Sequence, residues 1–265
     1  MTEKEYRSHP AISRSELWKI KESPEKFKWY KENPQPPTPA LVFGQFLHAL
    51  VLTPDAVNND FVMMPNFDRR TKQGKEEYEA FISSVGDRTP ISTEMYALGL
   101  NMANAIEKHP IASKLIKGET ELPLFWTDEQ TGEECKCRLD VIRKAKERLI
   151  IVDLKTAEDA STEAFVKSMI NYGYDFQAAM YSEGVKKHYG TDPLFVFVVI
   201  EKKEPFAINV LQADEYVLRR GYDLYRELLG IYHECKTTNN WYGYLGEGQI
   251  INSLSLPAWL AKEVE

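Results

Sequence analysis

The stretch that decides the fold of this chain reads Cys137-Arg138-Leu139-Asp140, followed after a short basic turn by Ile150-Ile151-Val152-Asp153-Leu154-Lys155. Side chains alternate between the two faces of a strand, so the arginine and aspartate of the first segment share a face, as do the aspartate and lysine of the second. A hairpin through residues 143–148 would bring these pairs together. Carboxylates beside Ile and Val are unfavourable in a strand centre unless something compensates them, and a divalent metal is the usual compensation. The stretch therefore predicts paired strands that carry a metal site.

Composition limits the classes of protein that this chain can belong to. Its 265 residues can bury a full hydrophobic core. No apolar run reaches the roughly 18 to 20 residues that span a bilayer, and the N-terminus does not have the pattern of a signal peptide, so we expect a cytoplasmic protein. The net charge of −7 argues against a protein that coats nucleic acid through bulk electrostatics. It is compatible with a DNA enzyme that binds metal through carboxylates and has only local clusters of cationic groups.

The cysteines predict neither disulfides nor a metal cluster. Cys135, Cys137 and Cys235 lack the spacing of paired metal ligands, and the first two alternate with polar residues. We expect these two as small apolar residues on the core side of a strand.

Hydrophobic patterning predicts the α/β class, with a central mixed β-sheet flanked by helices. The apolar run 194–200 is long enough for a strand that is buried on both faces. Strands are expected at 121–127, 135–143, 148–155, 194–200 and 206–211, and helices at 40–52, 76–85, 93–109, 162–169, 175–189 and 214–235.

Residues 1–265 are interpreted as a single domain with three parts. Residues 1–115 form a largely helical N-terminal portion, which contains a helix start at Ser13-Arg14-Ser15-Glu16. Residues 116–240 form the α/β core, and residues 241–265 form a tail rich in aromatic side chains.

Side chains suited to metal and phosphate chemistry occur in a fixed order around the two central strands. They are His48 with Gly44 upstream, Glu121, Arg138-x-Asp140, Asp153-x-Lys155 and Gln177-x-x-x-Tyr181. In this order they resemble the RecB-like branch of the PD-(D/E)XK nuclease superfamily, and within it the RecE-type exonucleases represented by the exodeoxyribonuclease VIII nuclease domain. The segments Ser13–Leu17, Arg70-Thr71-Lys72 and Asp128–Gly132 are also similar to that family, so the resemblance covers most of the chain.

The resemblance implies the PD-(D/E)XK nuclease fold and a bound divalent metal. Asp140 and Asp153 would bind Mg²⁺ or Mn²⁺ with the Leu154 carbonyl, because hard oxygen ligands suit these ions. His48 would be an additional ligand, and Glu121 is a candidate ligand for a second metal. Leu139 stands where the family has a proline, but the chemistry needs the following carboxylate and not that proline.

The other residues of the motif are implied to act on water or DNA. Lys155 would orient or activate the attacking water and offset the charge that grows on the phosphate. Gln177 and Tyr181 would line the site and complete the catalytic set. Residues expected to contact DNA are Arg138, Arg70 and Lys72.

A substrate and partners also follow from the resemblance. The family implies digestion of linear duplex DNA from 5′ ends, which leaves a 3′ single strand for a RecT-like single-strand annealing protein. It also implies a ring-shaped homo-oligomer, a trimer or a tetramer. A ring would let an acidic protein confine its positive potential to a central channel.

Two other interpretations stay open from the sequence. One is an endonuclease or a single-strand-specific nuclease on the same scaffold. The other is a non-catalytic module of this fold that binds DNA or protein. The presence of Asp140, Asp153 and Lys155 together argues against the second, because degenerate nucleases usually lose one of them.

Overall fold

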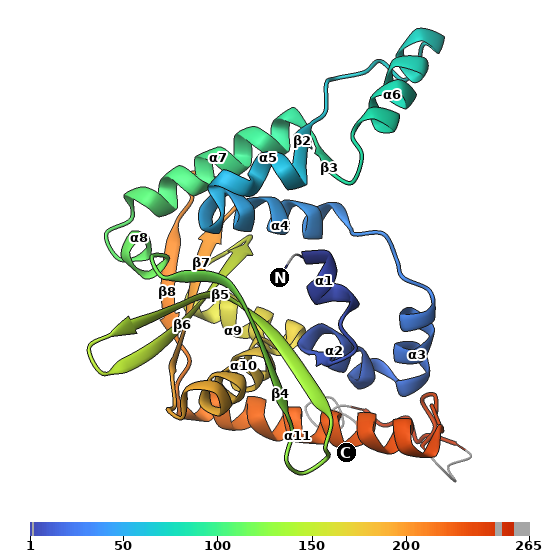
Figure 1. Ribbon diagram of the computed structural model, residues 1–265, viewed down its shortest axis with the longest axis vertical. Coiled ribbons are helices and arrows are strands. Elements are labelled where there is room, and N and C mark those ends of the chain that lie inside the picture. The colour runs from blue at the N-terminus through green and yellow to red at the C-terminus, as the bar shows by residue number, and fades with distance from the viewer. Residues whose placement is uncertain (2, 247–250, 257–265) are drawn as a thin grey trace.

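The computed structural model describes residues 1, 3–246 and 251–256, and it contains a central mixed β-sheet with helices on both faces (Figure 1). Among these residues the sheet consists of β1 (Ile12–Ser13), β4 (Glu119–Thr127), β5 (Glu134–Ala145), β6 (Arg148–Ala157), β7 (Leu194–Glu201) and β8 (Ile208–Gln212). The strand order is β1-β5-β6-β7-β8, and β4 pairs with the opposite edge of β5. β6 and β7 are parallel, whereas β5 is antiparallel to both β4 and β6. The predicted α/β class and mixed sheet are confirmed.

Helices cover both faces of the sheet and bury its apolar side chains in two clusters. The first face packs against α4 (Pro39–Leu52), α7 (Thr93–Lys108) and α8 (Ala112–Leu115). The opposite face packs against α2 (Arg14–Glu22), α3 (Pro24–Glu32), α9 (Thr162–Tyr172), α10 (Tyr174–Tyr189) and α11 (Glu215–Thr238). In β7 the residues 195–200 are all buried, as predicted for a strand covered on both faces.

Local capping explains where several helices begin. Ser13 accepts a hydrogen bond from the Glu16 backbone N–H, and the Glu16 carboxylate accepts one from the Ser13 N–H at 2.9 Å, which completes a capping box at the predicted start of α2. α6 (Lys72–Ser84) begins four residues before the predicted start, because Thr71 caps it through the Gly74 N–H.

A small subdomain lies outside the main sheet. β2 (Phe61–Met63) follows α5 (Val57–Asp60) and the 3-10 turn η1 (Pro54–Ala56), and it pairs in parallel with β3 (Thr89–Ile91). Between these two strands the chain leaves the body and returns, and α6 projects away from the central sheet (Figure 1). Neither short strand was predicted. The predicted strand 206–211 also begins later, at Ile208, because Phe206 adopts a left-handed φ of 57° in the preceding turn.

The start of the aromatic tail is part of the core. Trp241 stacks on Phe27 with ring centroids 5.3 Å apart and packs against Tyr232 at 6.2 Å. The second tryptophan of the tail, Trp259, lies outside the described residues. Within the described ranges the cysteines are buried and free, as predicted. A search of the described helices found none long and apolar enough to cross a membrane.

The turn between β4 and β5 is tied to α11 by a charged pair. Asp128 is buried and forms a bidentate ion pair with Arg226, and its Oδ1 also accepts a hydrogen bond from Thr131 N–H at 2.8 Å. Burial alone raises the pKa of Asp128, but the hydrogen bonds from Arg226 and Thr131 outweigh burial and lower this pKa to about 2. The carboxylate therefore contributes stability above its unfolded pKa, and this contribution is lost as the pH falls toward 2.

We expect Arg226→Met to lower the free energy of unfolding by about 1–2 kcal/mol at pH 7, because Arg226 makes the largest of the interactions that lower the pKa of Asp128. The difference from the wild type should shrink as the pH falls below the unfolded pKa of about 4. Urea denaturation at pH 7 and at pH 3 measures it. A difference that is the same at both pH values would contradict the assignment to Asp128.

Candidate metal centre

The centre lies where β5 and β6 separate. The last paired residues are Val141 and Val152, so Asp140 and Asp153 are the next residues along the two strands. Because β6 diverges there, the Leu154 backbone N–H is free of strand β5 and donates to Asp140 Oδ2 at 2.8 Å. The opening of the hairpin thus places the Asp140 carboxylate beside a backbone N–H of β6. The predicted meeting of the two aspartates occurs, although they turn toward different helices.

Asp140 is turned toward α4, which supplies His48. The His48 Nδ1 lies 3.5 Å from Asp140 Oδ1, and Nε2–H donates to the Leu154 carbonyl at 2.9 Å. Burial alone lowers the pKa of His48, but the Asp140 carboxylate outweighs burial and raises this pKa to about 9. Burial alone raises the pKa of Asp140, but His48 and Lys155 favour the charged carboxylate, so the pKa of Asp140 is lowered. His48 and Asp140 therefore form a charged pair at the centre, and a cation that binds to the imidazole would displace its proton.

Glu121 lies opposite Asp140 in the register of β4 and β5. The flanking pairs are Thr120 with Val141 and Leu122 with Leu139, but Glu121 itself has a left-handed φ of 52° and leaves the ladder. Such a conformation is strained for a residue other than glycine, and strained residues are concentrated at functional sites. Burial first, and then the nearby Asp140 carboxylate, raise the pKa of Glu121 to about 7. Its Oε2 also lies 2.7 Å from Nε of Arg138.

Asp153 is turned toward the other face, where α10 lies. Its carboxylate accepts a hydrogen bond from Gln177 Nε2 and forms an ion pair with Lys155. Burial raises the pKa of Asp153 to about 6, although the Lys155 ammonium acts in the opposite direction. The ring of Tyr174 lies 5.0 Å from Lys155 Nζ and covers it.

The junction between α9 and α10 fixes Gln177 in this position. Gly173 has a left-handed φ of 66°, and a Cβ at this residue would lie 2.2 Å from the Trp18 ring, so only glycine fits. Arg14 donates to the carbonyls of Tyr172 and Gly173 and thereby joins α2 to the junction.

The residues present suit a divalent cation. One ligand atom each from His48, Glu121 and Asp140 lies within 4.8 Å of the others, and the Leu154 carbonyl is beside them. Carboxylate, carbonyl and imidazole groups are ligands of Mg²⁺ and Mn²⁺. Burial first, and then the Asp140 carboxylate, raise the pKa values of Glu121 and Asp153, so a cation at the centre would favour the charged forms of these carboxylates. Asp153 stands next to this group but is turned toward Gln177 and Lys155.

His48→Ala should weaken Mn²⁺ binding by about 10- to 100-fold, because imidazole is a good ligand of this ion and its neighbours hold it in place. Isothermal titration with Mn²⁺ measures the affinity. The matched control is His188→Ala, which removes an exposed imidazole at the end of α10. Equal affinities of the His48 variant and the control would show that His48 is not a ligand.

The structure places the other predicted residues at different distances from the centre. Arg138 contacts Glu121, and Tyr181 lies one turn after Gln177 on α10, packed against the core. Tyr181 has a raised pKa, because it is buried and lies near Tyr6, Asp153 and Asp140. Arg70 and Lys72 are not brought to the centre. Lys72 is the first residue of the projecting α6 and its side chain is 92% exposed, Arg70 lies two residues before it, and their contact with DNA remains a prediction.

Tyr174 and Arg14 were not predicted to have roles at this site. Tyr174 stands one helical turn before Gln177, and that spacing was the available signal. Arg14 reaches the site only through contacts that are distant in the sequence.

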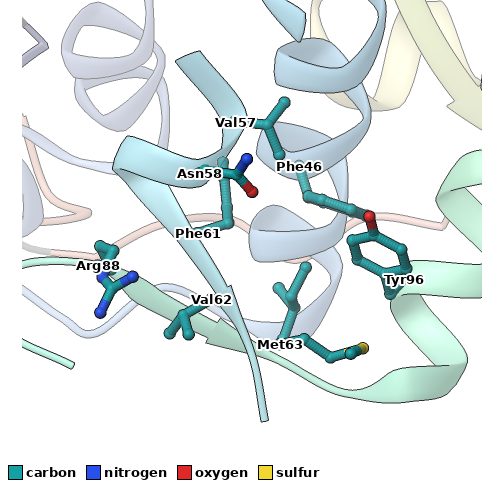
Figure 2. A pocket seen from close by; sticks show the side chains of 9 residues that line it. Phe46, Val57, Asn58, Phe61, Val62, Met63, Arg88 and Tyr96 are labelled. Atoms are coloured by element: carbon teal, nitrogen blue, oxygen red, sulfur yellow. The ribbon is translucent and has the colours of Figure 1, made fainter. Parts of the chain in front are cut away.

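A separate cavity of about 320 Å³ lies between the small subdomain and the helices α4 and α7 (Figure 2). Phe46 and Tyr96 line it, and Arg88 contributes a charged group. The lining is otherwise mostly apolar and contains no carboxylate, so we place no metal chemistry there. The lining residues are Phe46, Val57, Asn58, Phe61, Val62, Met63, Arg88, Ile91 and Tyr96.

The fold and the centre together define a member of the PD-(D/E)XK nuclease superfamily. Residues 13–253 match the model of a family described as a PDDEXK-like domain of unknown function, and the chain belongs to this family. A crystal structure of a candidate exonuclease from Eubacterium rectale is similar, with a TM-score of 0.64 and 14% identity over 97% of this chain and 96% of that one. This likeness shows the fold.

A more distant likeness is to the crystal structure of SSO0001, with a TM-score of 0.33 and 16% identity over 72% of this chain and 86% of that one. No curated protein matches the sequence.

Proposed function

We propose that this protein is a metal-dependent exodeoxyribonuclease that hydrolyses the phosphodiester bonds of linear duplex DNA. The observation that supports the proposal best is the meeting of Asp140, Asp153 and Lys155 at the opening between β5 and β6, with His48 beside them. These groups supply a cation site and an ammonium within one small volume. The family to which the chain belongs has the fold that such nucleases use.

Each side chain of the centre has a distinct task in hydrolysis. A divalent cation held by His48, Asp140, Asp153 and the Leu154 carbonyl, with Glu121 nearby, would lower the pKa of a bound water and clamp the scissile phosphate. Lys155 would orient the attacking water and offset the charge that develops on the phosphate. Gln177 holds the Asp153 carboxylate in place.

Other residues would contact the DNA. Arg138 lies beside Glu121 and would approach a phosphate, because a guanidinium can make two parallel hydrogen bonds to its oxygens. Tyr181 would line the site from α10. Arg70 and Lys72 on the projecting subdomain would contact the DNA backbone farther along the duplex.

The finer proposal is a RecE-type exonuclease that digests 5′ to 3′ and leaves a 3′ overhang. Its support is the order of His48, Glu121, Arg138-x-Asp140, Asp153-x-Lys155 and Gln177-x-x-x-Tyr181 along the chain. The product would suit a RecT-like single-strand annealing protein as a partner. The resemblance to the RecE-type exonucleases also implies a ring-shaped trimer or tetramer, in which a protein with a net charge of −7 would gather its local cationic groups around a channel. Light scattering under active conditions should then give a mass above that of the monomer.

The experiment uses linear duplex DNA labelled at either the 5′ or the 3′ end, incubated with the protein and Mg²⁺. Early release of the 5′ label, with the 3′ label retained in long fragments, is expected. Early release of the 3′ label would contradict the polarity. Internal cuts in covalently closed duplex would favour an endonuclease instead.

A further inference from the structure

The first helix of the chain lies beside the centre and has no part in the mechanism above. α1 (Glu3–Ser8) lies between α4 and α2 in Figure 1. Its end packs over the first half of β5, where the alternation of the strand puts Lys136 and Arg138 on the same face as Asp140. Two cationic side chains on this face would suit DNA phosphates along a path that leads away from the metal centre.

Lys136 does not serve this path. Its side chain is buried, and Nζ donates to the carbonyl oxygens of Tyr6 and His9 at 2.8 Å each and of Arg7 at 3.4 Å. An ammonium group has three donors, so these contacts occupy all of them. Lys136 therefore fixes the end of α1 on β5 and is not available to a phosphate.

Aromatic contacts hold the same segment in place. The Tyr6 ring centroid lies 4.9 Å from Lys136 Nζ and 5.4 Å from Arg138 Cζ. The His9 ring packs on Phe125 of β4, with ring centroids 4.5 Å apart. Tyr6 therefore stands directly over Arg138, the residue that precedes Asp140 on this face.

The distance along β5 from the residue under Tyr6 to the metal centre is short. Arg138 and Asp140 are two residues apart in a strand, which is about 6.6 Å. This is about the axial rise of two base pairs of duplex DNA, whereas the backbone of one strand, which winds around that axis, spans it in about one nucleotide. A DNA strand that runs along β5 from the centre would therefore meet α1 after about one or two nucleotides.

We infer that α1 closes one end of the substrate path, and that Tyr6 is a specificity-determining residue that restricts cleavage to DNA strands with a free end. The inference rests on the proposed nuclease activity. A strand end fits in the short space between Asp140 and Tyr6, whereas a continuous strand would have to pass through the volume that Tyr6 occupies. The same geometry predicts mononucleotides and dinucleotides as products.

The test compares linear duplex DNA with covalently closed circles of the same duplex, which have no end, in the presence of Mg²⁺. The wild type should digest the linear DNA and leave the circles closed. Tyr6→Ala should open the circles at least about tenfold faster than the wild type, while its rate on linear DNA stays within about threefold. Lys136→Met should have the same effect on circles, because it releases the end of α1 without changing Tyr6. The control is Tyr216→Ala, whose ring is 70% exposed on α11.

The outcomes separate this inference from the proposed function. If the wild type digests linear DNA and both variants are folded by circular dichroism but open circles no faster than the control, the role of α1 is wrong and the exonuclease proposal stands. Opening of circles by the wild type would also overturn the inference. Failure of the wild type to digest linear DNA would overturn the proposed function and this inference with it.

Discussion

Asp140→Asn is expected to lower the rate of DNA hydrolysis on the order of a thousandfold, which corresponds to about 4 kcal/mol of transition-state stabilisation. In the wild type the Leu154 N–H donates to Asp140 Oδ2 at 2.8 Å. The side-chain oxygen of asparagine can accept the same hydrogen bond, so the strands should keep their positions. The substitution removes the negative charge that pairs with His48 and that a cation would need. Release of acid-soluble nucleotides from linear duplex measures the rate.

The control for this variant is Asp192→Asn. The Asp192 side chain is 77% exposed and forms only surface ion pairs with Lys186, so its loss should leave the rate unchanged. Circular dichroism checks that both variants fold. If Asp140→Asn keeps more than about a tenth of the wild-type rate, Asp140 is not a ligand in the productive complex.

Lys155→Met should lower kcat by about 100- to 1,000-fold without weakening metal binding, since the removal of one stabilising donor has an effect of this size. Lys155 is 16% exposed and lies against Asp153. Its ammonium repels a cation, so its loss should leave Mn²⁺ affinity unchanged or make binding tighter. Single-turnover kinetics and Mn²⁺ titration measure the two quantities separately.

Lys202→Met is the matched control for Lys155→Met. Lys202 is 29% exposed and pairs with Glu158 at the far end of β7. A parallel loss of kcat and Mn²⁺ affinity in the Lys155 variant would indicate a collapsed site, and would contradict the assignment of Lys155 to the attacking water and phosphate.

Local patterns were sufficient to predict the central strands and the pairing of Asp153 with Lys155, whereas the assignment of His48 and Gln177 came from the family resemblance. Alternation placed Cys135 and Cys137 in the core and Asp153 beside Lys155, since the period of a strand is fixed by its geometry. The hairpin between β5 and β6 was predicted from the short basic turn, but β5 continues two residues into that turn and ends at Ala145. The order of the polar residues allowed His48 and Gln177 to be assigned to the centre although they lie on helices far away in sequence.

Other features depend on contacts that no local pattern encodes. β1 has two residues and exists only because it pairs with β5 at Cys135 and Lys136. The left-handed conformation of Glu121 is set by the strands around it and has no sequence signal, because glutamate rarely adopts it. The turn of Asp140 toward α4 and of Asp153 toward α10 likewise follows from where β6 leaves β5, which is a property of the assembled sheet.

The central claim is that this centre uses a divalent metal to hydrolyse DNA, and nucleotide release from linear duplex by the wild type tests it most directly. The account predicts rapid release with Mg²⁺ or Mn²⁺ and none with EDTA, and recovery of activity when excess metal is added back to the EDTA sample. A folded wild-type protein that releases no nucleotides with either metal, or that releases them equally well in EDTA, would contradict it.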